Sequence, residues 1–146
     1  MRIPDAESMR AFGERLAACL RDKDVLLLSG PMGAGKSELA RGIARGLGYS
    51  GPIPSPTFTL LNQYEGGRLN LYHFDWYRID SPVELYEAGL HEVIGASGVT
   101  AIEWHEKAPA LVPERALEIV ILPLNDGARD VTLLSRGGFH ALSEDL

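Results

Sequence analysis

The feature that most constrains the fold is the octet Gly30-Pro31-Met32-Gly33-Ala34-Gly35-Lys36-Ser37, which fits the pattern G-x-x-x-x-G-K-[ST]. It follows an apolar run at residues 24–29 and precedes a helical pattern at residues 37–47, which Gly48 ends. Glycines at this spacing let backbone N–H groups turn inward around a phosphate, and the helix N-terminus adds the positive end of its dipole. The sequence therefore predicts a phosphate-binding loop between a buried strand and a helix.

Two side chains of the octet have a predicted chemical role. Lys36 extends a positive charge to the β- and γ-phosphates of a nucleotide, and the hydroxyl of Ser37 is a ligand for Mg²⁺. A later proline-held loop carries the hydroxyls of residues 55–59, where proteins of this kind often sense the γ-phosphate or the metal. The nucleotide contacts that we predict are Gly30, Pro31, Met32, Gly33, Ala34, Gly35, Lys36, Ser37, Glu38 and Thr57.

Two carboxylates follow predicted strands and are candidates to hold the metal or to orient the attacking water. Asp75 comes directly after residues 69–74, and Glu103 comes after residues 99–102. In open α/β sheets, ligands lie beyond the carboxyl ends of the strands, so both side chains could converge on the phosphates. The sequence leaves two alternatives open, a turn-forming role for Asp75 and a solvated strand end for Glu103.

The remaining pattern predicts an α/β fold, a single P-loop NTPase domain with helices flanking a mixed sheet that has a parallel centre and antiparallel hairpins. We assign residues 1–136 to this domain and expect residues 137–146 to form a flexible tail. Gly13 is expected to weaken the first helix. His73, Tyr64 and Trp76 are interpreted as structural or packing residues. The predicted elements are helices at residues 8–20, 37–47 and from Ser81 onward, and strands at 24–29, 58–64, 69–74, 99–104, 116–122 and 130–134.

Composition excludes several classes of protein. The 146 residues are 45% hydrophobic, which is enough for one core and rules out wholesale disorder. A formal charge of −6, from 20 acidic and 14 basic residues, argues against a chain that grips nucleic acid by itself. A single cysteine excludes an internal disulfide. No apolar run approaches the ~20 residues that span a bilayer, and residues 1–5 hold no apolar signal core, so we expect a cytoplasmic protein with no membrane contact. We also expect the isolated chain to be monomeric.

With these motifs in place, the chain resembles the TsaE (YjeE) family, the small P-loop ATPases of bacterial tRNA threonylcarbamoyladenosine synthesis. The resemblance covers residues 8–136 and rests on the octet, Ser55-Pro56-Thr57-Phe58-Thr59-Leu60, Asn62-Gln63-Tyr64, His73-Phe74-Asp75-Trp76-Tyr77-Arg78 and Ile102-Glu103-Trp104. It implies ATP and Mg²⁺ as cofactors, with the metal at Ser37, Asp75 and Glu103, and Glu103 as the residue that activates water. It also implies TsaD and TsaB as partners, whose threonylcarbamoyl transfer to the adenosine beside the anticodon the ATPase sustains, so that tRNA is met only through the complex.

Three other functions compete with the ATPase. A small-molecule or nucleotide kinase on the same fold is the main alternative, but no long insertion with clustered arginines follows the P-loop helix to close over the phosphates. A protein that switches conformation on binding a nucleotide, with negligible turnover, remains a second alternative. A GTPase is disfavoured because no Asn-Lys-x-Asp segment occurs to recognise guanine.

Overall fold

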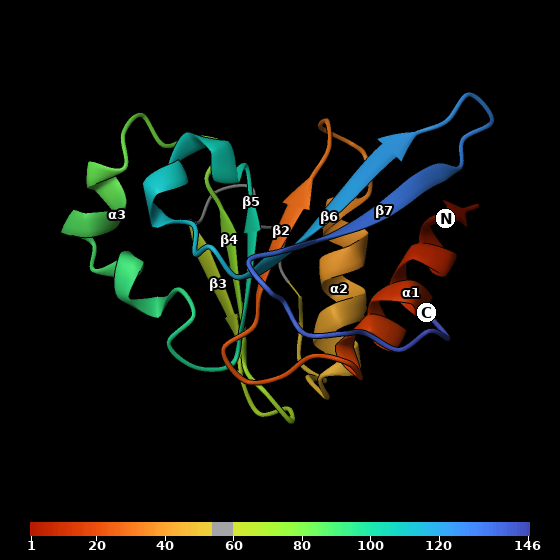
Figure 1. The fold of residues 1–146 in the computed structure, drawn as a ribbon, viewed down its shortest axis with the longest axis horizontal. Helices are drawn as coiled ribbons and strands as arrows, with labels where there is room; N and C mark the ends of the chain where they lie inside the picture. Colours follow the sequence, from red (N-terminus) through yellow and green to blue (C-terminus); the bar gives the residue numbers. More distant parts are fainter. Residues whose placement is uncertain (54–59) are drawn as a thin grey trace.

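The fold is built by strands and helices that alternate around the glycine-rich octet (Figure 1). A computed structural model describes residues 1–53 and 60–146. No helix in these ranges is long and apolar enough to cross a bilayer. The strands are β1 (Arg2–Ile3), β2 (Val25–Ser29), β3 (Leu61–Tyr64), β4 (Leu71–Asp75), β5 (Val99–Glu103), β6 (Ala116–Pro123) and β7 (Arg129–Arg136). The helices are α1 (Ala6–Ala17), α2 (Lys36–Gly46) and α3 (Val83–Glu87), with 3₁₀ turns η2 (Leu90–Val93), η3 (His105–Lys107) and η4 (Pro109–Leu111).

The described strands form one mixed sheet in the order β1-β7-β6-β2-β5-β4-β3. At its centre, β2 pairs in parallel with both β5 and β6, and β5 pairs in parallel with β4. The pairs β3–β4 and β6–β7 are antiparallel hairpins. The predicted α/β class, with a parallel centre and antiparallel hairpins, is confirmed. This order places the loop after β2 at the middle of the sheet, beside the carboxyl ends of β4 and β5.

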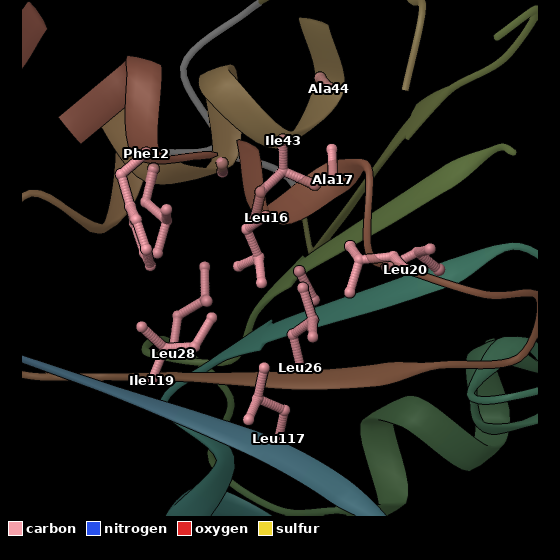
Figure 2. Packing of buried hydrophobic residues seen from close by; sticks show 14 of the residues in the cluster. Phe12, Leu16, Ala17, Leu20, Leu26, Leu28, Ile43, Ala44, Leu117 and Ile119 are labelled. Carbon is pink, nitrogen blue, oxygen red and sulfur yellow. The ribbon is translucent and has the colours of Figure 1, made fainter. Parts of the chain in front are cut away.

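Helices α1 and α2 cover one face of the sheet, where the larger core cluster lies. Asp5 caps α1 by accepting the N–H of Ser8 at 2.8 Å, so the helix begins two residues before the predicted start. A Cβ at Gly13 would lie 2.7 Å from the carbonyl oxygen of Leu39, so this glycine permits the close approach of the two helices. Figure 2 shows the resulting core between the helices and the strands, with Phe12, Leu16, Ala17, Leu20, Leu26, Leu28, Ile43, Ala44, Leu117 and Ile119.

The opposite face of the sheet carries a second core cluster beneath α3 and the 3₁₀ turns. Strand β2 serves both faces, with Val25 and Leu27 in this cluster, as expected for a central parallel strand. Trp76 is fully buried and packs edge-on against Phe74, with ring centroids 5.7 Å apart, which confirms its predicted packing role. Helix α3 begins at Val83, two residues after the predicted Ser81 cap.

Both ends of the chain differ from the sequence expectation. Strand β1 was not predicted. It pairs with β7 over only two residues, and no local sequence pattern indicates so short a pairing. Residues 137–146 were expected to form a flexible tail, yet Phe139 is 6% exposed and packs on the core. The Nε2 atom of His140 lies 2.6 Å from Oδ2 of Asp24, a fully buried carboxylate. A buried charge needs partners, and one partner of Asp24 comes from residues 137–146.

Candidate active site around the phosphate loop

The glycine-rich loop runs from the end of β2 to the first turn of α2, the context that the motif requires. Its three glycines have φ between 79° and 148°. A Cβ at Gly30 would lie 2.3 Å from the carbonyl oxygen of Ile121, so β6 leaves no room for a side chain there. The N–H of Ala34 donates to the carbonyl of Pro31 at 3.1 Å and closes the turn. The loop is thus a compact turn at a helix N-terminus, a geometry that suits an anion.

Lys36 begins α2 and folds its side chain over this loop. Its Nζ donates a 2.8 Å hydrogen bond to the carbonyl oxygen of Gly30 and lies 4.2 Å from the centroid of the Trp104 ring. Only 5% of Lys36 is exposed. Burial lowers the pKa of Lys36 from its ordinary value, while the negative charges of Glu103 and Asp75 act to raise it. Both carboxylates are therefore within electrostatic reach of the ammonium group.

Asp75 and Glu103 are register partners at the ends of the parallel strands β4 and β5. Burial raises the pKa of Asp75 above its ordinary value; the N–H of Tyr77 acts against this shift, and the charge of Glu103 adds to it. The N–H of Tyr77 donates to Oδ1 of Asp75 at 3.0 Å. Asp75 therefore also forms a turn, which was the alternative role that the sequence left open. Glu103 is 5% exposed and is not a solvated strand end. The two carboxylates therefore lie side by side at adjacent strand ends, and their convergence on a phosphate stays a prediction.

One of these carboxylates, Glu103, is in contact with His73, for which the sequence predicted only a structural role. The Nε2 atom of His73 lies 2.7 Å from Oε2 of Glu103, and the two side chains are 2% and 6% exposed. The Nδ1 atom of His73 has no hydrogen-bond partner among the described residues. The one available signal was a polar residue inside an otherwise apolar strand that ends at Asp75. That pattern does not reveal the contact, because it depends on which strand lies next to β4.

Trp104 follows Glu103 in a backbone conformation that bulky residues rarely adopt, with φ of 60°. This conformation ends β5 and turns the chain into η3. The Trp104 ring lies under Lys36 on one side, and the Tyr77 ring lies 5.0 Å away at an angle of 49°. The Trp104 ring thus borders the Lys36 ammonium, and the Tyr77 ring packs against Trp104. Such strain occurs where surrounding contacts fix the backbone, and it clusters at functional sites.

The donor set at this site fits a magnesium ion held partly by a nucleotide. No group of three or more His, Cys, Asp or Glu side chains in the described ranges is placed to hold a metal by itself. A P-loop magnesium ion takes a hydroxyl and a carboxylate from the protein and completes its shell with phosphate oxygens and water. Ser37 is exposed in the first turn of α2, and Asp75 and Glu103 supply carboxylate oxygens. Hard oxygen donors of this kind suit Mg²⁺.

The other predicted nucleotide contacts differ in their surroundings. Pro31 and Met32 are exposed on the loop, and Met32 has 66% of its surface accessible. The Glu38 carboxylate accepts a 2.7 Å hydrogen bond from Nη1 of Arg10 on α1. The group of Glu38 that remains available to a phosphate is its backbone N–H, in the first turn of α2. Thr57 and the other residues of 54–59 lie outside the described part of the chain.

Comparison with known proteins agrees with this geometry. The family model described as "Threonylcarbamoyl adenosine biosynthesis protein TsaE" matches residues 3–131. The tRNA threonylcarbamoyladenosine biosynthesis protein TsaE of Haemophilus influenzae is 36% identical over 139 residues, covering 92% of this chain and 87% of the relative. The protein of the same name from Bacillus subtilis is 36% identical over 146 residues, covering 99% of this chain and 91% of the relative.

A solved structure extends the likeness to three dimensions. The crystal structure of YdiB from Bacillus subtilis superposes with a TM-score of 0.79 at 34% sequence identity. The match covers 94% of this chain and 85% of that one. Sequence, fold and the strand–loop–helix context of the motif therefore agree, and the chain belongs to the TsaE family of tRNA threonylcarbamoyladenosine biosynthesis proteins.

Proposed function

We propose that this TsaE-family chain is a Mg²⁺-dependent ATPase whose hydrolysis supports threonylcarbamoyl transfer to the adenosine beside the tRNA anticodon. The observation that carries the proposal is the meeting of Lys36, Asp75 and Glu103 at the phosphate loop. A lysine on a glycine-rich loop and carboxylates at adjacent strand ends are the groups that nucleotide hydrolysis by a P-loop protein requires.

Lys36 binds the β- and γ-phosphates in this proposal. Its ammonium now donates to the carbonyl of Gly30 and exchanges that acceptor for phosphate oxygens when ATP enters. The exchange is favourable, because the phosphate group is ionised and a carbonyl is neutral, and hydrogen bonds to ionised acceptors are stronger. The loop amides and the N-terminus of α2 bind the same phosphates. When bound, the metal at Ser37, Asp75 and Glu103 supplies charge neutralisation at the phosphate oxygens.

Glu103 orients the attacking water and accepts its proton. Its Oε2 is held by His73, so Oε1 is the oxygen that would face both the metal and the water. Burial of Glu103 keeps bulk water away and strengthens its interaction with the few polar groups nearby. The face of the Trp104 ring makes a cation–π contact with the Lys36 ammonium, which helps to fix the position of Lys36.

The partners in this proposal are TsaD- and TsaB-like proteins, with tRNA bound by the complex and not by this chain. The net charge of −6 supports that division, because autonomous RNA binders carry the opposite balance. A cytoplasmic location and a monomeric state of the isolated chain belong to the same proposal. An arginine supplied by a partner raises hydrolysis by about 10³–10⁵-fold in related P-loop systems, so the isolated chain is expected to turn over slowly.

Calorimetric titration of ATP into the Mg²⁺-containing protein tests the nucleotide site. Lys36→Ala should weaken ATP binding at least ~tenfold, which corresponds to about 1.4 kcal/mol. Lys23→Ala is the matched control, because Lys23 precedes the opposite end of β2. Equal affinities in the wild type and a folded Lys36→Ala protein would contradict the assignment. Product analysis with added nucleosides separates an ATPase from a kinase.

A further inference from the structure

A guanidinium group outside the motif contacts the phosphate loop. Arg129 begins β7, and its Nε donates to the carbonyl of Ala34 at 2.7 Å while Nη2 donates to that of Gly33 at 3.2 Å. Its Nη1 donates to the carbonyls of Gly127 at 3.0 Å and Ala128 at 3.3 Å. One side chain thus joins the phosphate loop to the turn between β6 and β7 through four backbone carbonyls.

The turn that carries Arg129 is itself well fixed. The N–H of Leu124 donates to the carbonyl of Ala128 at 2.8 Å, and the N–H of Ala128 donates to Oδ1 of Asp126 at 3.0 Å. Nη2 of Arg2 donates to Oδ2 of the same Asp126 at 2.7 Å. Arg129 is also flanked in the sheet by β1 and β6, as the register partner of Ile3 and Pro123. The guanidinium therefore has a rigid base.

The hydrogen bonds to the loop also determine where its amides point. In a trans peptide the C=O and the following N–H point to opposite sides of the chain. Because the carbonyls of Gly33 and Ala34 face Arg129, the N–H groups of Ala34 and Gly35 face away from it. The first donates to Pro31 inside the loop. The second belongs to the N-cap residue of α2, where an anion binds.

We propose that Arg129 is a positioning residue of the phosphate loop: it holds the peptide planes of Gly33 and Ala34 so that the loop amides are oriented before a nucleotide enters. The inference rests on the proposed nucleotide-binding function. Arginine suits this role because its planar fork presents donors in several fixed directions. Lysine has the same charge but is a point donor on a flexible stem, so it cannot span both segments.

Two readouts on the full-length protein test this role. The first is the affinity for ADP by calorimetry, and the second is amide hydrogen exchange at residues 33–35 without nucleotide. Arg129→Gln and Arg129→Lys should each weaken ADP binding about tenfold, the size expected for losing charge-assisted hydrogen bonds. Both should raise exchange at residues 33–35 several-fold. Arg45→Gln is the control, because Arg45 donates to the carbonyl of Tyr49 at the other end of α2 and should change neither readout.

Each outcome decides the matter. Wild-type affinity and wild-type exchange in Arg129→Lys would overturn the role of the fork, since charge alone would then suffice. Unchanged exchange in folded Arg129→Gln would overturn the positioning role altogether. If the wild type binds no ADP but Arg129→Gln still raises loop exchange, the proposed nucleotide function fails and the loop-holding role of Arg129 stands.

Discussion

The imidazole Nε2 of His73 lies 2.7 Å from Oε2 of Glu103, and both side chains are almost completely buried. The contact joins two neighbouring parallel strands at the edge of the sheet where the phosphate loop begins. It commits one oxygen of Glu103 to the protein and fixes the orientation of the carboxylate. Glu103 is thus held in a fixed orientation, as its proposed catalytic role requires.

Glu103 is expected to act in hydrolysis more than in binding. Glu103→Ala should lower steady-state ATP turnover at least ~10²-fold, the usual effect of losing a positioned acid–base group. ATP affinity should fall less, because Lys36 and the loop amides keep their phosphate contacts. Phosphate release and calorimetry on the same preparations give the two numbers. Turnover like that of the wild type in the assembled complex would refute this role.

His73 is expected to act through Glu103. His73→Leu removes the donor and should lower kcat by about 10–100-fold, as substitutions behind catalytic and metal ligands do, with ATP affinity little changed. His73→Gln keeps an N–H donor and should recover part of the loss. A purely structural role predicts that kcat follows the thermal stability of the two variants and not the presence of the donor.

The ionised side chain of Asp75 is expected to destabilise the folded protein when no nucleotide is bound. Burial raises its pKa in the folded state, so the penalty for ionising it is fully present above that folded pKa and vanishes below the ordinary value. Asp75→Asn should therefore raise Tm at pH 7 by about 1–3 °C, less than for a fully buried carboxylate because Asp75 is only partly buried, while Mg²⁺-dependent ATP turnover falls. The gain in Tm should shrink as the pH is lowered through the acidic range. A lower Tm at pH 7 would show that ionised Asp75 is stabilising.

The C-terminal segment is expected to contribute to stability through His140. His140→Ala removes a 2.6 Å partner from the fully buried Asp24, which keeps Nη2 of Arg115 at 3.3 Å and the N–H of Arg21 at 2.8 Å. The loss should be about 2–3 kcal/mol in urea unfolding, below the full effect of isolating a buried charge because two partners remain. Adding Asp24→Asn should recover part of it. ATP affinity should not change, since the contact lies at the other end of β2 from the loop.

Local sequence patterns predicted much of this fold because each depends on residues close together in the chain. The octet, the apolar run before it and the helical spacing after it are short-range signals, and together they predicted the strand–loop–helix that β2 and α2 form. The β6–β7 hairpin follows from two apolar strands around residues 125–127. Asp75 and Glu103 were proposed as site residues because strand ends of a parallel sheet face the same edge, and the structure makes them register partners.

Contacts between distant segments could not be predicted in this way. The His73–Glu103 pair requires that β4 lie beside β5 in a particular register, and Arg129 meets the phosphate loop across 95 residues of chain. The pairing of β1 and the contact of His140 with Asp24 likewise depend on the finished fold. Sequence spacing carries no record of sheet order, so these residues looked like ordinary surface or core positions.

The most direct test of the central claim is steady-state phosphate release from Mg²⁺-ATP by the pure chain, followed by titration with a TsaD–TsaB-like complex with and without tRNA. Lys36→Ala and Lys23→Ala serve as the negative and positive controls. The account predicts slow hydrolysis by the chain alone, marked stimulation by the partner complex, and loss of both activities in Lys36→Ala. No phosphate release under any of these conditions, or release that Lys36→Ala leaves unchanged, would contradict it.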